Sequence, residues 1–243
     1  MQPYAKDFYE ITRGSSGSAS MIVALLMRNC EVTSVLDVGC AGGTWLSAWK
    51  QAGVPRVLGI DGMDAADNTL EIAPTEFMRH DLTSMLRLDA RFDLAQSLEV
   101  AEHLPASAAD MIVDALVSHS DIVLFSAAPP GQGGDRHVNE QPYAYWQAKF
   151  ASRGFDLFDC IRPALRDCRD VRYWYRYNTF LFANSKGAAR LSRNWQDTLL
   201  AAGQTPQDIS PALFKLRKCF VRLMPVSIQT AISIRMARLR TGS

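Results

Sequence analysis

Short apolar runs alternate with stretches of helical character along the first half of the chain. Apolar runs that polar or turn residues bound on both sides are typical of buried strands. They predict strands over residues 35–38, 57–60, 77–79, 92–95 and 122–125. The stretches beside them predict helices over residues 19–29, 44–52 and 105–118, the first with Ser18 as its N-cap. Because strands that alternate with helices build parallel sheets covered on both faces, the pattern indicates an α/β fold.

The later part of the chain has a different pattern. It predicts a helix over residues 142–153 and strands over 155–161 and 177–183. Few crossover elements separate these two strands, so we expect an antiparallel end to the sheet. From Arg190 onward the chain is expected to be helical, with breaks near residues 203–206 and at Pro225.

Composition narrows the class of protein without changing this fold. The chain has 243 residues, of which 48% are hydrophobic and 21% charged, which is ordinary for a globular protein and excludes a disordered or collagen-like chain. Five dispersed cysteines form no CxxC pair, so a zinc or redox motif is not expected. We expect reduced thiols in the cytosol instead. Neither a membrane-spanning run nor a secretory signal is evident, and a cytoplasmic location is predicted.

Charge divides the chain into two parts. Residues 209–243 hold seven basic residues and no acidic one, which leaves 19 basic against 25 acidic residues upstream. We therefore expect a domain over residues 1–186, with residues 1–18 as a candidate lid, and a basic helical appendage over residues 187–243.

The appendage contains a predicted amphipathic helix. One face carries Leu213, Leu216, Phe220 and Leu223, the opposite face carries Lys215, Lys218 and Arg222, and Arg217 interrupts the apolar side. Three interpretations stay open: docking on the anionic inner face of a membrane, contact with nucleic acid phosphates, or packing on the domain with a solvated basic face. Because the body of the chain is acidic, nucleic acid is the least favoured partner.

The strongest chemical signal is the glycine-rich loop at residues 39–43, between the first strand and its helix. Glycines there let the backbone approach a ligand closely, and a helix N-terminus favours polar or anionic groups. A dinucleotide fingerprint would need glycines at positions 39, 41 and 44, but Ala41 and Thr44 stand at two of them, so a nicotinamide oxidoreductase is disfavoured.

Two aspartates follow the next two predicted strands. Asp61 ends the second strand, where a carboxylate can accept hydrogen bonds from ribose hydroxyls, and Asp81 follows the third, where it can accept from an adenine amino group. The carboxyl ends of neighbouring parallel strands converge, and open α/β sheets bind their ligands there. The loop and both aspartates therefore predict a nucleoside-binding site.

Residues 35–43, Val-Leu-Asp-Val-Gly-Cys-Ala-Gly-Gly, resemble the first motif of the class I S-adenosylmethionine-dependent methyltransferases. That motif is acidic-x-Gly-x-Gly-x-Gly. Asp37, Gly39 and Gly43 match it, whereas Ala41 replaces the middle glycine.

The resemblance extends to two further motifs. Residues 57–61 resemble the second motif, with Asp61 as the ribose ligand, and residues 92–104 resemble the motif of the fourth strand. It implies a Rossmann-like three-layer sandwich, with a mostly parallel seven-stranded sheet and an antiparallel C-terminal strand. It also implies a cofactor, S-adenosylmethionine, and the residues that bind it: Asp37, Gly39, Cys40, Ala41, Gly43, Asp61, Gly62, Asp81, Leu82, Ser97 and Glu99.

Residues 133–142 and 171–178 resemble a bacterial subgroup of these enzymes that is associated with glycans and secondary metabolites. The resemblance implies O-methylation of a small-molecule or glycan acceptor. The catalytic candidates are His137, as base or orienter of the acceptor, and His103, which either takes part in catalysis or holds the geometry of the site. Candidate acceptor residues are Tyr9, Asn139 and Trp146. A surface salt bridge is the simpler interpretation for Glu102, and no metal ligand set is predicted.

Two alternatives remain at this level. An RNA methyltransferase would use the basic appendage as its RNA contact, and a non-catalytic module would keep the cofactor fold without turnover. The sequence leaves the acceptor, the methylated atom and the oligomeric state open.

Overall fold

The structure is a computed structural model, which describes residues 14–62, 70–201 and 203–224. Its centre is a seven-stranded sheet in the order β3-β2-β1-β4-β5-β7-β6. The strands are β1 (Ser34–Val38), β2 (Arg56–Asp61), β3 (Phe77–Arg79), β4 (Leu94–Leu98), β5 (Ile122–Ser126), β6 (Asp156–Phe158) and β7 (Phe180–Ala183). In this order, each strand from β3 through β2, β1 and β4 to β5 pairs in parallel with its neighbour. Strand β7 pairs antiparallel with both β5 and β6. The predicted fold class is therefore confirmed.

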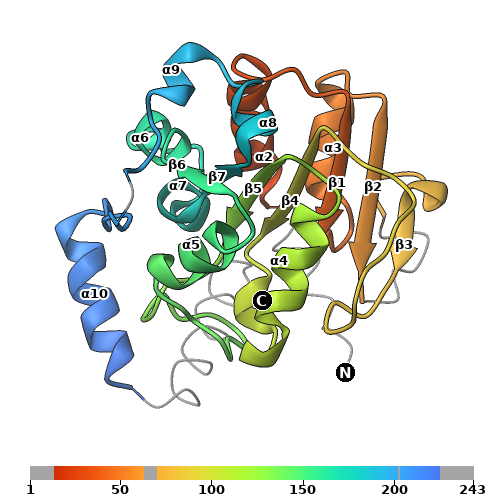
Figure 1. The fold of residues 1–243 in the computed structure, drawn as a ribbon. Coiled ribbons are helices and arrows are strands. Elements are labelled where there is room, and N and C mark those ends of the chain that lie inside the picture. The colour runs from red at the N-terminus through yellow and green to blue at the C-terminus, as the bar shows by residue number, and fades with distance from the viewer. Residues whose placement is uncertain (1–13, 63–69, 202, 225–243) are drawn as a thin grey trace.

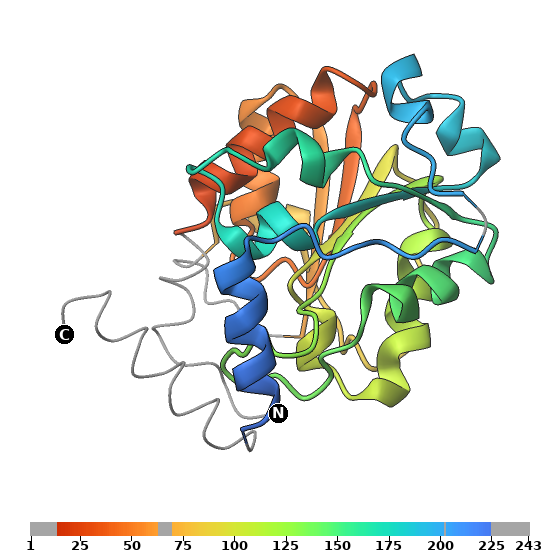
Figure 2. The same cartoon turned by 90° about the vertical axis from the view of Figure 1, so that its left-hand side faces the viewer.

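Helices cover both faces of this sheet (Figures 1 and 2). The longer ones are α2 (Ser16–Met27), α3 (Thr44–Gln51), α4 (Ala109–Val117), α5 (Tyr143–Ala151) and α10 (Ala212–Arg222). The shorter ones are α6 (Ile161–Leu165), α7 (Tyr173–Asn178), α8 (Ser185–Ala188), α9 (Arg193–Gln196) and the 3-10 turns η2 (Pro74–Glu76), η3 (Ala101–His103) and η4 (Ala106–Ala108). Helices α2 and α3 lie on one face, and α4 and α5 lie on the other, so each face has its own apolar core.

Two predicted boundaries shift for reasons that involve distant residues. Helix α2 begins at Ser16, because the hydroxyl of Ser18 accepts a hydrogen bond from the backbone N–H of Arg172 instead of capping its own helix. Strand β4 begins at Leu94, because Asp93 turns its carboxylate toward Thr33, whose backbone N–H and hydroxyl both donate to it.

The segment after β7 is less helical than the sequence predicts. Leu191 and Trp195 pack into the same core as α2, and the chain between α9 and α10 is irregular. The fully buried Arg162 holds that irregular segment, since its guanidinium forms an ion pair with Asp159 and donates to the carbonyl of Gln207. A long-range contact of this kind leaves no local signal in the sequence.

Helix α10 packs on the loop that follows β5. Arg217 donates to the carbonyl of Gln132 at 2.9 Å, and the ring centroids of Phe214 and Tyr173 are 4.9 Å apart. The face of α10 that meets the domain thus carries Phe214 and Arg217, while the predicted apolar stripe points away. Its leucines and phenylalanine are exposed: Leu213, Leu216, Phe220 and Leu223.

Candidate functional site

The carboxyl ends of β1 and β4 lie side by side at the centre of the sheet. The strand order reverses between them, since the chain runs outward from β1 to β3 on one side and from β4 to β5 on the other. Open α/β sheets bind ligands in the crevice at such a switch point. The predicted cofactor loop and the Glu99–His103 segment both start from these two strand ends.

The loop after β1 has a backbone that demands glycine at two positions. Gly39 and Gly43 lie in the left-handed region, with φ of 88° and 85°. A Cβ on Gly39 would lie 2.5 Å from the Val100 side chain, and one on Gly43 would lie 2.9 Å from Ile72. The close packing of Gly39 on Val100 also brings the loop against the segment after β4.

Asp61 at the end of β2 fixes the same loop. One carboxylate oxygen of Asp61 accepts a hydrogen bond from the backbone N–H of Ala41 at 2.8 Å, and the N–H groups of Gly39 and Cys40 donate to the carbonyl of Ile60. The ends of β1 and β2 are thus joined through the predicted ribose ligand.

Ala41 adopts a left-handed backbone, with φ of 47°, at the position where the family motif has its middle glycine. This conformation costs an L-residue about 1–2 kcal/mol. We predict that Ala41→Gly raises the free energy of unfolding by up to about 1 kcal/mol in urea titrations, the gain being reduced by glycine's larger unfolded-state entropy. The control Ala151→Gly, at an exposed position of helix α5, should instead lower it by about 0.5–1 kcal/mol. An equal loss in both variants would contradict strain at Ala41.

Asp37 lies in the middle of β1 and is almost completely buried. Burial, together with the charge of Asp61, raises the pKa of its carboxyl to about 7. Below that pH the folded protein therefore holds Asp37 as a neutral acid inside the sheet.

This raised pKa predicts a stability that falls as the pH rises from about 4 to about 7. In that interval the unfolded chain has lost the Asp37 proton, whose ordinary pKa is about 3.9, while the folded protein keeps it. The expected loss is about 1.4 kcal/mol per pH unit, and Asp37→Asn should lack it because the amide does not titrate. Urea titrations of both proteins across this range measure the difference; parallel curves would contradict the shifted pKa.

The remaining predicted cofactor residues lie around this edge and differ in how far they are exposed to solvent. Asp81 is exposed and accepts from the backbone N–H and the hydroxyl of Thr83, so one of its oxygens caps its own turn. The Cys40 thiol lies in the core against Gly59, and Ser97 is fully buried in β4. Gly62 and Leu82 are half-buried. Their roles toward the cofactor stay predictions.

Glu99, which the resemblance places among the cofactor residues, lies at the same edge directly after β4. It adopts a left-handed φ of 56°, and its backbone N–H donates to the carbonyl and hydroxyl of Ser126 at the end of β5. Such a backbone in a residue other than glycine is strained and persists where the surrounding structure enforces it. The strand end therefore directs the Glu99 side chain inward, where burial raises the pKa of its carboxyl.

The loop after β5 holds His137 against this segment. The Glu140 carboxylate accepts from the backbone N–H groups of Gly131 and Gly133 at 2.7 Å each, and from Nδ1 of His137 at 2.8 Å. The backbone N–H groups of Val138 and Asn139 both donate to the carbonyl of Glu102. These bonds fix His137 next to the turn that carries Glu102 and His103.

The rings of His103 and His137 meet edge to face, with centroids 4.9 Å apart. Burial, together with the neighbouring His137, lowers the pKa of His103 to about 4. Glu102 is fully buried rather than engaged in the surface salt bridge that the sequence suggests, and burial together with the charge of Glu99 raises its pKa well above the ordinary value. The ligating atoms of these three residues all lie within 4.8 Å of one another, so they could hold a metal ion.

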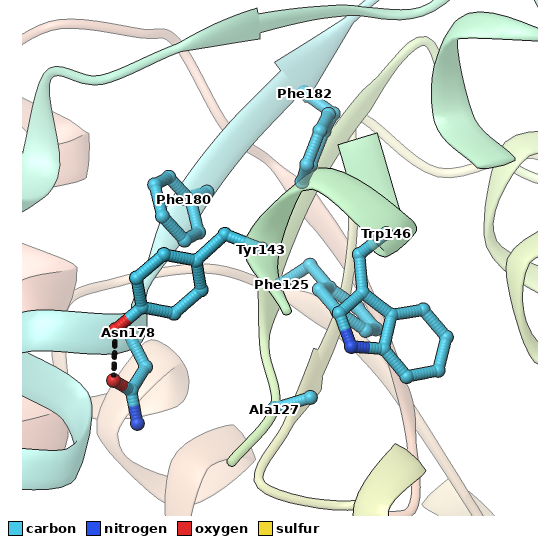
Figure 3. Close-up of a pocket in the computed structure, with 7 residues that line it drawn as sticks. All are labelled: Phe125, Ala127, Tyr143, Trp146, Asn178, Phe180 and Phe182. Carbon is cyan, nitrogen blue, oxygen red and sulfur yellow. Dashed lines mark hydrogen bonds between the residues drawn. The ribbon is translucent and has the colours of Figure 1, made fainter. Parts of the chain in front are cut away.

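A buried chain of hydrogen bonds leads away from Glu99. Gln132 donates to the Glu99 carboxylate at 2.8 Å, Asn178 donates to the Gln132 side-chain carbonyl at 2.6 Å, and the Tyr143 hydroxyl donates to Asn178 at 2.9 Å. Figure 3 shows the last of these bonds beside a small closed pocket that Phe125, Trp146 and other aromatic residues line. Sequence analysis missed this chain, because its members lie far apart and no motif contains them.

Two of the three predicted acceptor residues lie among the described residues, and both are buried. Asn139 is buried and its amide donates to the carbonyl of Ala101, so it ties the His137 loop to the Glu102 turn. Trp146 is buried in the core between α5 and β5, 5.1 Å from the Phe125 ring. Tyr9 and the rest of the candidate lid up to residue 13 lie outside the described residues.

Comparison with known proteins agrees with this geometry. Residues 16–127 match the model of a methyltransferase domain family. The matched residues, a little under half of the chain, thus form a methyltransferase domain, and the fold around them is that of class I. S-adenosylmethionine is the cofactor of that class, so the predicted family and cofactor are confirmed.

Solved structures share the fold of this methyltransferase domain. The magnesium protoporphyrin IX methyltransferase ChlM from Synechocystis PCC 6803 is 22% identical, with a TM-score of 0.51 over 71% of this chain and 80% of that one. The sugar N-methyltransferase KedS8 from Streptoalloteichus sp ATCC 53650 is 15% identical, with a TM-score of 0.56 over 76% and 94%. DesVI from Streptomyces venezuelae is 16% identical, with a TM-score of 0.54 over 74% and 96%. No curated protein matches the chain.

Proposed function

We propose that this methyltransferase moves the methyl group of S-adenosylmethionine to a hydroxyl of a small-molecule or sugar acceptor. The proposal rests on one observation: Gly39 packs closely against the Val100 side chain, so the loop after β1 and the segment after β4 lie next to each other. On one side lies the glycine loop that Asp61 fixes, and on the other lie the carboxyl and imidazole groups of Glu99, Glu102, His103 and His137. The sugar and amino pentose methyltransferases among its structural relatives support a polar acceptor of this kind.

The reaction needs alignment more than stabilisation of charge. The acceptor oxygen attacks the methyl carbon, the S–C bond breaks, its electron pair returns to sulfur, and neutral S-adenosylhomocysteine leaves. Holding the two reactants in line supplies much of the acceleration. The acceptor must also lose its hydroxyl proton, a step that a positioned base assists by about 10²–10⁴-fold.

His137 has the geometry for work on the acceptor. Its Nδ1 donates to the Glu140 carboxylate, which leaves a lone pair on Nε2. The pair of Glu140 and His137 can therefore orient the acceptor or take its proton through Nε2. His103 is held neutral next to it by burial, which lowers its pKa to about 4, and suits a supporting role.

Cofactor binding tests the proposal first. Calorimetry on the full chain should give one site for S-adenosylmethionine and S-adenosylhomocysteine, and Asp61→Ala should weaken both at least tenfold, because it removes the ribose acceptor and the bond to Ala41. The control is Asp156→Ala at the exposed start of β6, on the far edge of the sheet, which should bind as the wild type does. A folded wild type that binds neither compound would end the methyl-transfer proposal.

We also propose that α10 docks the enzyme on an anionic membrane surface. Leu213 and Leu223 are 80% and 83% exposed, and Leu216 and Phe220 are 54% and 57% exposed. Exposed Lys215 and Arg222 lie on the other face of the same helix, and residues 209–243 contain no acidic side chain that would repel the lipid. A helix with an apolar face and a basic polar face is typical of interfacial binding. Among the helices that the structure describes, none combines the length and apolar composition needed to cross a membrane.

Vesicle flotation measures this docking. The full chain should float with vesicles of phosphatidylglycerol and phosphatidylcholine and not with phosphatidylcholine alone. The double variant Leu216→Glu with Phe220→Glu should lose flotation, while Leu199→Glu, at a half-exposed leucine elsewhere on the surface, should keep it. Absence of flotation would overturn the proposal, and dimerisation that the double variant abolishes would assign the stripe to a second copy instead.

A further inference from the structure

We propose that Glu102, His103 and His137 bind a divalent transition-metal ion of the Zn²⁺ type on the acceptor side of the site. Their ligating atoms all lie within 4.8 Å of one another. A tetrahedral ion with bonds of about 2.1 Å would hold such atoms roughly 3.4 Å apart. A contraction of at most about 1.4 Å would therefore close the site around the ion.

Glu102 provides an observation independent of that spacing. Its side chain is completely buried, and neither carboxylate oxygen has a hydrogen bond of ordinary geometry among the described residues, although the backbone N–H of Ala128 and the Glu99 carboxyl act on it. Buried polar atoms without partners are rare and costly in folded proteins. A bound cation would satisfy both the charge and the lone pairs of this carboxylate.

His137 is arranged as metal-binding histidines are. Its Nδ1 is hydrogen-bonded to the Glu140 carboxylate at 2.8 Å, which fixes the ring and leaves Nε2 available to bind the metal ion. A carboxylate behind a histidine ligand is the usual outer support of a zinc site. Gly134 makes room for this ring, since a Cβ there would lie 2.0 Å from Nε2.

The donor set determines the class of ion. Two imidazoles and one carboxylate suit Zn²⁺, whereas Mg²⁺ prefers oxygen ligands alone. Three protein ligands are typical of catalytic zinc sites, which keep a further position open. Resting on the proposed methyl transfer, we assign that position to the acceptor oxygen. With the ion bound, Nε2 of His137 is a ligand and not a base, so the ion orients the acceptor and its hydroxyl proton leaves to water.

The test measures Zn²⁺ binding to the full chain after removal of metal by a chelator. Calorimetry should give one equivalent, bound at least tenfold more tightly than Mg²⁺. Glu102→Gln and His137→Ala should each weaken Zn²⁺ at least tenfold. Glu140→Gln, which removes the carboxylate behind the ring and also alters the bonds to Gly131 and Gly133, should weaken it about 10–100-fold. The control His80→Gln, at a half-buried histidine outside the cluster, should bind as the wild type does.

A second measurement covers variants that fail to fold. Wild-type crystals grown with Zn²⁺ should give an anomalous scattering peak between Glu102, His103 and His137. No bound ion, a peak elsewhere, or unchanged affinity in the folded ligand variants would overturn the proposal. Because Zn²⁺ binding is measured without cofactor, an ion site in a protein that ignores S-adenosylmethionine would refute the methyl transfer and leave the metal site standing.

Discussion

The hydrogen bond between the Ala41 backbone and the Asp61 carboxylate is the contact on which the candidate site depends. It joins the loop after β1 to the end of β2, and so turns two separate strand ends into one surface. The glycine at position 39 then allows the loop to press against the side chain of Val100, which follows Glu99 after β4. The proposed nucleoside site at Asp61 and the proposed acceptor site beyond Glu99 would therefore meet across this one close contact.

The acceptor side is built from groups that water would otherwise solvate. Glu99 and Glu102 are buried, and burial raises the pKa of both. Isolated carboxylates in such surroundings are unfavourable, and proteins compensate them with protons, hydrogen bonds or cations. Gln132 donates to one carboxylate oxygen of Glu99, whereas neither oxygen of Glu102 has a hydrogen bond of ordinary geometry among the described residues. This difference between two neighbouring carboxyl groups is the physical basis for placing a cation at Glu102.

Sequence reasoning predicted those parts of the molecule that local pattern determines. Short apolar runs gave the strands, and the motif around Gly39 and Asp61 gave the cofactor edge, because each depends on residues adjacent in the chain. Parts that depend on distant partners were missed. Ser18 does not cap its helix because Arg172 uses its hydroxyl, and the segment after α9 is irregular because Arg162 holds Gln207. The burial of Glu102 likewise depends on the loop that carries Val138 and Asn139.

The same loop also connects the site to the surface helix. Gln132 donates through its side chain to Glu99, and its carbonyl accepts from Arg217 of α10. A Cβ on the adjacent Gly131 would lie 2.3 Å from the Lys218 carbonyl, so the helix backbone rests directly on the loop. A helix displaced at its outer face must therefore disturb the residue that compensates the Glu99 carboxylate. If α10 sits on a membrane, the position of the lipid surface and the state of the acceptor site are physically linked through this one glutamine.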